Sequence, residues 1–179
     1  MSKPLICLVG TSGSGKSTIA NKLERKYGYT SVKSYTTRPP RNSEDDLKTH
    51  TFISPDRVAD YKDDIVADTK FNGNYYFCTK KQLNMSDIYV IDPKGLITLY
   101  NNYFGRDIIA VYLDVPSEIV KQRMEQRGDS EEAIVSRIKH DEEVFKGAKE
   151  LCDFVCDNST QEKSNDICEF IDMLIRYRK

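Results

Sequence analysis

The chain alternates short apolar runs with stretches in which apolar residues recur at helical spacing. Residues 5–9, 88–91 and 108–113 carry only aliphatic, aromatic or thiol side chains. Such runs are typical of strands buried on both faces of a parallel sheet. A last short strand is predicted at 153–156.

Helices are predicted after these strands. The first has apolar residues at helical spacing and ends at Gly28 in a left-handed conformation; its apolar positions are Ile19, Ala20, Leu23 and Tyr27. Further helices are predicted at 95–102, at 117–127 with Ser117 as N-cap, and at 165–177. Strands alternating with helices predict an α/β fold with a parallel core sheet.

Two stretches interrupt this alternation. Residues 34–76 are polar and contain strand-like pieces at 49–53, 65–68 and 74–77, and Asn72-Gly73 favours a hairpin between the last two. Residues 127–150 are highly charged and poor in apolar side chains. We expect one domain, with a core at about 1–33, 79–126 and 151–179, a small, mostly β insertion at about 34–78, and a helical lid at about 127–150.

Composition narrows the classes of partner. The 27 basic and 28 acidic residues give a net charge of −1, which excludes a generally basic nucleic-acid coat and does not favour an anionic membrane surface. No apolar run reaches the roughly 18–20 residues of a transmembrane helix, and the N-terminus lacks a secretory pattern. The five cysteines are odd in number and irregularly spaced. We therefore expect a cytoplasmic protein without disulfides, nucleic-acid partners or membrane contact.

The strongest chemical signal is the segment GTSGSGKS at 10–17, which fits G-x-x-x-x-G-K-[ST] without a mismatch. Glycines let such a loop turn its backbone N–H groups toward phosphate oxygens, and the following helix adds its positive end. Lys16 can reach the β- and γ-phosphates, and the Ser17 hydroxyl can ligate Mg²⁺. The predicted triphosphate-binding residues are Gly10, Ser12, Gly13, Ser14, Gly15, Lys16, Ser17 and Thr18.

Two further basic sets follow. Arg38 and Arg41 lie three residues apart in a Pro-containing loop that also carries hydroxyl groups, and guanidinium forks suit phosphate. A later set consists of Arg123, Arg127 and Arg137, and a mobile charged segment with arginines suits a phosphoryl-transfer lid.

Taken together, these segments resemble the guanylate kinase family of nucleoside monophosphate kinases. The segments GTSGSGKST, SYTTRPPRNSE and FNGNYY occur in family order, followed by Asp92 with Gly95, then RMEQRG and FVCDN. The resemblance implies a P-loop NTPase three-layer fold with a parallel core sheet, a small, mostly β NMP-binding subdomain and a helical lid.

The resemblance also assigns residues. It implies that Arg127 and Arg137 close on the transferring group and that Asn158 lies in the stretch lining adenine. Asp92 stands where the family has an acid facing the acceptor and a metal-bound water. The implied acceptor-binding residues are Ser34, Arg38, Arg41, Glu44 and Tyr76, with His50 at the position of a family Tyr.

Departures from the family pattern gather in the part that reads the acceptor base. Ala67 stands where the family has a Glu that reads guanine, and Cys78 stands where it has a Ser or Thr. Asp68 is adjacent to the missing Glu, but a shift of one residue in a strand points the side chain to the other face unless a bulge intervenes. The acceptor set therefore includes Ala67 and Cys78 as altered positions.

The reaction we expect is ATP-dependent transfer of the γ-phosphoryl group, with Mg²⁺, to a nucleoside monophosphate, namely GMP or dGMP. Lys16, Arg38, Arg127 and Arg137 would be catalytic, and Ser17 would ligate Mg²⁺ with Asp92 acting through water. The alternatives are a monophosphate kinase for another base, a ribose-phosphate kinase, and a non-catalytic guanylate-kinase-like binding module. Partners would be nucleotides, and the chain would be a monomer or a homodimer.

Overall fold

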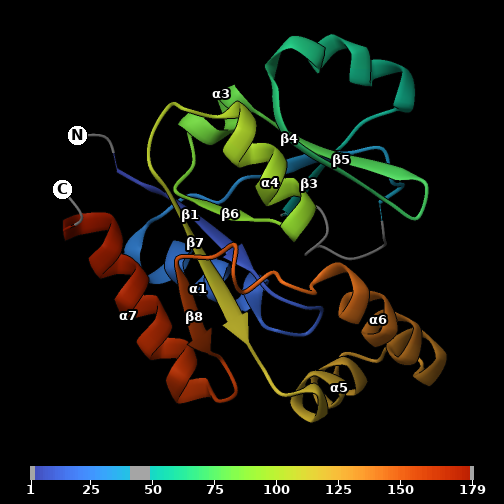
Figure 1. Ribbon diagram of the computed structural model, residues 1–179, viewed down its shortest axis with the longest axis vertical. Coiled ribbons are helices and arrows are strands. Elements are labelled where there is room, and N and C mark those ends of the chain that lie inside the picture. Colours follow the sequence, from blue (N-terminus) through green and yellow to red (C-terminus); the bar gives the residue numbers. More distant parts are fainter. Residues whose placement is uncertain (1–2, 41–48, 178–179) are drawn as a thin grey trace.

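The computed structural model describes residues 3–40 and 49–177 (Figure 1). Its core is a sheet of four strands in the order β6 (Ile88–Val90), β1 (Leu5–Val9), β7 (Ile108–Asp114) and β8 (Phe154–Asp157). All neighbouring pairs in this sheet are parallel. The predicted α/β fold with a parallel core sheet is therefore confirmed.

The alternation of side chains along β1 produces layers on both faces of this sheet. Ile6 and Leu8 pack with helices α1 (Lys16–Tyr27) and α7 (Gln161–Tyr177). Leu5, Cys7 and Val9 pack on the other face, against α4 (Pro93–Asn102) and part of a second sheet. Because all five side chains are fully buried, β1 is apolar throughout.

The second sheet is mixed, with the order β3 (His50–Phe52), β2 (Ser34–Thr36), β5 (Asn74–Thr79) and β4 (Ile65–Phe71). Strands β2 and β3 are parallel, whereas β5 is antiparallel to both of its neighbours. Asn72 and Gly73 join β4 to β5 with φ angles of 47° and 74°. Positive φ at both central residues is the geometry that an Asn-Gly hairpin requires, so the predicted hairpin is confirmed.

Helices α5 (Ser117–Gln126) and α6 (Glu131–Val144) form a projecting pair, which we call the α5–α6 unit (Figure 1). Its small apolar cluster contains Val120, Met124 and Ile134. Gly128, at a φ of 88°, lies between the two helices.

Several element boundaries differ from the sequence predictions. Ser117 is the first residue of α5 rather than its N-cap; Pro116 takes the cap position, without a side-chain hydrogen bond. Helix α7 begins four residues before the predicted start. The 3-10 helix η1 (Pro55–Asp64) and strand β2 were not predicted.

Helix α3 (Lys80–Asn84) was also missed, although the sequence carries its signal. The Thr79 hydroxyl accepts a hydrogen bond from the Gln82 backbone N–H, and the Gln82 side chain accepts one from the Thr79 backbone N–H. This reciprocal capping box begins many helices and can be read from T-x-x-Q. Across the part of the chain that the structure describes, no helix is both long and apolar enough to cross a membrane.

Candidate active site

The site lies where the carboxyl ends of the parallel strands meet at one edge of the core sheet. Gly10 follows β1, Asp92 lies two residues after β6, Asp114 ends β7, and Asn158 follows β8. Open α/β sheets bind ligands at this edge, because the loops that leave the strands converge there.

The loop after β1 is so closely packed that two of its positions accept only glycine. Gly10 has a φ of 152°, and a Cβ atom there would lie 2.7 Å from Ser14 Oγ and 2.9 Å from the Leu113 carbonyl oxygen. Gly15 has a φ of 91°, and its Cβ would lie 2.5 Å from Asn158 Nδ2. A side chain at either position would strain the backbone and displace a neighbour.

Lys16 begins α1 and folds back over this loop. Its Nζ donates hydrogen bonds to the carbonyl oxygens of Gly10 at 2.6 Å and Thr11 at 2.8 Å. Desolvation lowers the pKa of the Lys16 ammonium to about 8, while the negative charge of Asp141 acts in the opposite direction. The ammonium is thus held at the loop, poised beside any anion that binds there.

Asn158 fixes the loop from the opposite side. Its Nδ2 donates to the Ser14 carbonyl at 2.7 Å, and its Oδ1 accepts from the Ser164 hydroxyl at 2.5 Å. The residue is 1% exposed. Each end of the amide is therefore engaged within the protein, so the structure shows Asn158 as a brace for the loop.

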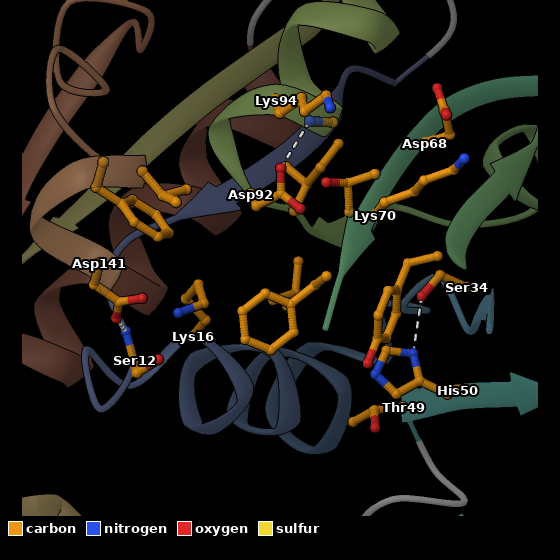
Figure 2. Close-up of a pocket in the computed structure, with 18 of the residues that line it drawn as sticks. Ser12, Lys16, Ser34, Thr49, His50, Asp68, Lys70, Asp92, Lys94 and Asp141 are labelled. Carbon is orange, nitrogen blue, oxygen red and sulfur yellow. Dashed lines mark hydrogen bonds between the residues drawn. The ribbon is translucent and has the colours of Figure 1, made fainter. Parts of the chain in front are cut away.

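Two cavities open at this edge. The first, which we call the loop cavity, has a volume of about 490 Å³ and is lined by the phosphate loop, α5, α6 and the residues around Asn158. The second, which we call the hairpin cavity, has a volume of about 480 Å³ and lies between the β4–β5 hairpin, β3, α4 and α6 (Figure 2). Ser12, Lys16 and Arg137 line both cavities. A ligand in one cavity can therefore meet a ligand in the other beside the Lys16 ammonium.

The hairpin cavity contains groups suited to an anion. Ser34 Oγ and His50 Nδ1 are 2.9 Å apart (Figure 2). The Tyr76 ring meets the His50 ring edge-on, with 5.7 Å between the ring centres. Arg38 also lines this cavity, with its guanidinium 5.3 Å from the centre of the Phe52 ring. The structure thus brings together Ser34, Arg38, His50 and Tyr76, four predicted acceptor-binding residues.

Asp92 lies between this cavity and the core. Its carboxylate caps α4 by accepting a hydrogen bond from the Gly95 backbone N–H at 2.8 Å. Burial raises the pKa of the Asp92 carboxyl, and the hydrogen bond from Gly95 opposes part of that rise. One carboxylate therefore both begins a helix and faces the hairpin cavity.

Two predicted acceptor residues do not line either cavity. Ala67 and Cys78 are opposite each other in the hairpin and fully buried in the core. A bulge between Ile65 and Ala67 shifts the register of β4. Asp68 lines the hairpin cavity, and its carboxylate accepts a hydrogen bond from the Tyr75 hydroxyl at 2.9 Å. The prediction that Ala67 and Cys78 face the ligand is corrected, because the bulge and the core packing place both beneath the cavity wall.

The predicted arginines occupy different places. Arg127 lines the loop cavity and pairs with Asp129, and Arg137 lies at the junction of the two cavities. Arg41 and Glu44 lie outside the described residues.

Two side chains make contacts with the phosphate loop that were not foreseen, although Arg123 was already one of the predicted lid arginines. Arg123 donates to the Asn158 carbonyl at 2.7 Å and to the Gly13 carbonyl at 3.3 Å. Asp141 accepts a hydrogen bond from the Ser12 backbone N–H at 2.6 Å. Their spacing carried a signal, since Arg123 and Asp141 each lie four residues from a predicted site arginine and hence on its helix face.

The predicted Mg²⁺ site can be compared with the side chains that the structure describes. Among residues 3–40 and 49–177, no group of three or more His, Cys, Asp or Glu side chains is placed to hold a metal ion. Mg²⁺, however, commonly takes one or two protein oxygens and completes its shell with phosphates and water. The Ser17 hydroxyl, on the first turn of α1 in the loop cavity, is consistent with that mode.

Comparisons with known proteins agree with this geometry. A family model described as an AAA domain matches residues 6–146. A guanylate kinase of Clostridium tetani is 34% identical over 145 residues, covering 75% of this chain and 69% of that protein. A guanylate kinase of Gloeobacter violaceus is 34% identical over 146 residues, covering 75% and 70%. The crystal structure of guanylate kinase from Anaplasma phagocytophilum has the same fold, with a TM-score of 0.67 at 21% identity, covering 98% of this chain and 88% of that one.

Proposed function

This chain belongs to the guanylate kinase family, and we propose that it transfers the γ-phosphoryl group of ATP to GMP or dGMP, giving ADP and the nucleoside diphosphate. The observation that carries the proposal is the meeting of two cavities at Ser12, Lys16 and Arg137. A phosphotransferase must bring donor and acceptor into contact at the phosphoryl group that moves. Here that contact point coincides with the phosphate loop.

ATP occupies the loop cavity in this proposal. The backbone N–H groups of the loop and the N-terminal end of α1 hold the β- and γ-phosphates, and Lys16 balances their charge. Arg127 and Arg137, carried by the α5–α6 unit acting as a lid, complete the positive surroundings of the transferring group. Arg123 and Asn158 keep the loop in shape through its carbonyl groups.

The acceptor occupies the hairpin cavity, so that the second sheet acts as the NMP-binding subdomain. Ser34, Arg38, His50 and Tyr76 surround the acceptor phosphate, which is the nucleophile. Its second pKa is about 6, so the attacking oxygen is already ionised at neutral pH and needs no general base. Catalysis then rests on positioning and charge stabilisation.

Mg²⁺ is part of the proposal. Ser17 would hold the ion together with the triphosphate, and Asp92 would contact its water. When bound, the ion neutralises the negative charge that develops on the phosphates. The protein residues supply the remaining positive charge and the orientation of both nucleotides.

Selectivity for guanine would rest on Asp68, whose carboxylate lines the hairpin cavity, because Ala67 and Cys78 lie beneath the cavity wall. A carboxylate can accept hydrogen bonds from the N–H groups of guanine, and each such donor left unpaired in a buried site would cost about 1–3 kcal/mol. We therefore keep GMP or dGMP as the proposed acceptor.

The test is a coupled assay of ADP formation from ATP and Mg²⁺ with GMP, dGMP, AMP, UMP, CMP, dTMP and a ribose bisphosphate. We expect the highest kcat/KM with GMP or dGMP, and no turnover by the folded Lys16→Ala protein. A higher kcat/KM with another base or with the sugar phosphate would replace the acceptor, and tight nucleotide binding without turnover would favour a binding module.

The cysteines support a cytoplasmic location in this proposal. Cys7, Cys78, Cys152, Cys156 and Cys168 are all free thiols in the structure. Proteins of reducing compartments keep their thiols in this form.

A further inference from the structure

Helix α6 sends one carboxylate into the phosphate loop. Asp141 Oδ2 accepts a hydrogen bond from the Ser12 backbone N–H at 2.6 Å, although the two residues are far apart in the sequence (Figure 2). Asp141 is 6% exposed and is the only charged side chain that is buried among the residues that the structure describes. Its neighbours Glu142 and Glu143 are exposed, as expected for a helix that projects from the core.

A buried carboxylate needs compensation, and the loop supplies it. The bond from a backbone N–H to a carboxylate is charge-assisted, and Lys16 attracts the same group. A phosphate loop is built to surround anionic oxygens with such donors. The Asp141 carboxylate therefore binds to the loop in the way that the anionic oxygens of a ligand would.

The position of this bond identifies which anion the carboxylate resembles. Ser12 is one of the three residues that line both cavities. In the proposed reaction the transferring phosphoryl group must lie at that junction, whereas the remaining phosphates of the donor lie farther into the loop cavity. The carboxylate and the γ-phosphate would compete for one donor, and their like charges would repel.

We propose that Asp141 is a specificity-determining residue for the donor nucleotide, occupying the γ-phosphate position until ATP displaces it. This inference rests on the proposed function. ATP must move the carboxylate away from Ser12, whereas ADP ends before the junction and leaves it in place. Asp141 thereby lowers the affinity for ATP relative to ADP and reoccupies the loop after the phosphoryl group has left.

Displacement of Asp141 requires movement of α6 against the core. The α5–α6 unit has its own small apolar cluster, and Phe145, directly after α6, packs against the main core. The neighbouring His140 also touches the hairpin, with its ring 4.8 Å from that of Phe71. Movement of α6 on ATP binding would thus also change the contact between His140 and Phe71 at the hairpin cavity.

The experiment measures binding of a non-hydrolysable ATP analogue and of ADP by calorimetry, each with Mg²⁺ and with chelator. Asp141→Asn keeps the size and the hydrogen-bonding oxygen but removes the charge, and Glu143→Gln is the matched control on an exposed position of the same helix. We expect Asp141→Asn to raise analogue affinity about tenfold and ADP affinity by less than about twofold. Glu143→Gln should change neither.

An unchanged or lower affinity of Asp141→Asn for the analogue would overturn the inference, as would an equal gain for ADP. A loss seen only with Mg²⁺ would instead assign Asp141 to the metal. Asp141→Ala, checked by thermal melting, provides a second variant that must show the same preference if Asn at this position disturbs folding. These measurements use no acceptor, so a failed acceptor panel would refute the proposed kinase activity without deciding the role of Asp141.

Discussion

Replacing Asn158 with Ala should destabilise the protein and loosen the phosphate loop. The side chain donates to the Ser14 carbonyl at 2.7 Å and accepts from Ser164 at 2.5 Å, and it is almost fully buried. In the variant the Ser164 hydroxyl can still donate to the Thr160 carbonyl, 3.1 Å away. The Ser14 carbonyl, in contrast, loses the hydrogen bond that Asn158 donates to it. An unpaired buried carbonyl and lost packing together should lower the free energy of unfolding by about 2–3 kcal/mol.

Urea denaturation followed by circular dichroism measures this change. Asn165→Ala is the matched control, because its side chain makes only an exposed hydrogen bond with Lys22 at 3.0 Å. The control should lie within about 0.5 kcal/mol of the wild type. If both variants unfold at the same urea concentration, the bracing role of Asn158 is refuted.

The same contact predicts a coupling with Gly15. A methyl group at position 15 would meet Asn158 Nδ2 at 2.5 Å and would also be strained by a φ of 91°. Gly15→Ala should therefore destabilise the wild type more than it destabilises Asn158→Ala, since only the backbone strain remains in the second background. An equal loss of stability in both backgrounds would show that a methyl group at position 15 does not clash with Asn158.

Four other substitutions or treatments test separate parts of the site. Lys16→Ala should keep its melting temperature near that of the wild type but lose at least about a hundredfold in kcat, measured by the coupled assay, because it removes charge from the transferring group. Arg38→Ala should raise the KM for the acceptor and leave the affinity for an ATP analogue unchanged by calorimetry; an equal loss of ATP affinity would place Arg38 on the donor side. Asp92→Asn should keep the α4 cap while kcat/KM falls. Because burial raises the folded pKa of Asp92, the stability that its neutral form contributes should be lost as pH rises through that pKa, and a melting series should show a smaller decline over this range in the variant than in the wild type. Burial also raises the pKa of the Cys7 and Cys78 thiols, so iodoacetamide at pH 8 should modify them only after unfolding, as mass spectrometry would report.

The core and the phosphate loop could be predicted from the sequence because their signals are local. Strand β1 is apolar at five consecutive positions, and the motif from Gly10 to Ser17 follows it directly. The hairpin could be predicted for the same reason, since Asn72-Gly73 fixes its turn without help from the rest of the chain.

The faces of β4 could not be assigned because they depend on tertiary packing. A bulge after Ile65 changes which side chains point to the core, and no residue type in that segment predicts the bulge. The resemblance placed Ala67 and Cys78 in the acceptor site, whereas both are packed beneath the cavity. The bonds from Asn158 to Ser14 and from Ser12 to Asp141 likewise join segments more than a hundred residues apart.

The charges at the junction of the two cavities give a reason for an acid on α6, the helix that we propose as part of a lid. The loop supplies backbone N–H donors and Lys16, and α6 supplies Arg137, so these groups by themselves would make the junction positive. The positive groups that stabilise the transferring phosphoryl group stay close together between catalytic cycles, when no phosphate is bound. Their mutual repulsion is then unfavourable. A carboxylate on the moving helix offsets that charge when the site is free and withdraws when the triphosphate arrives. The acid and Arg137, four residues apart on one face of α6, would then exchange places relative to the loop within each cycle.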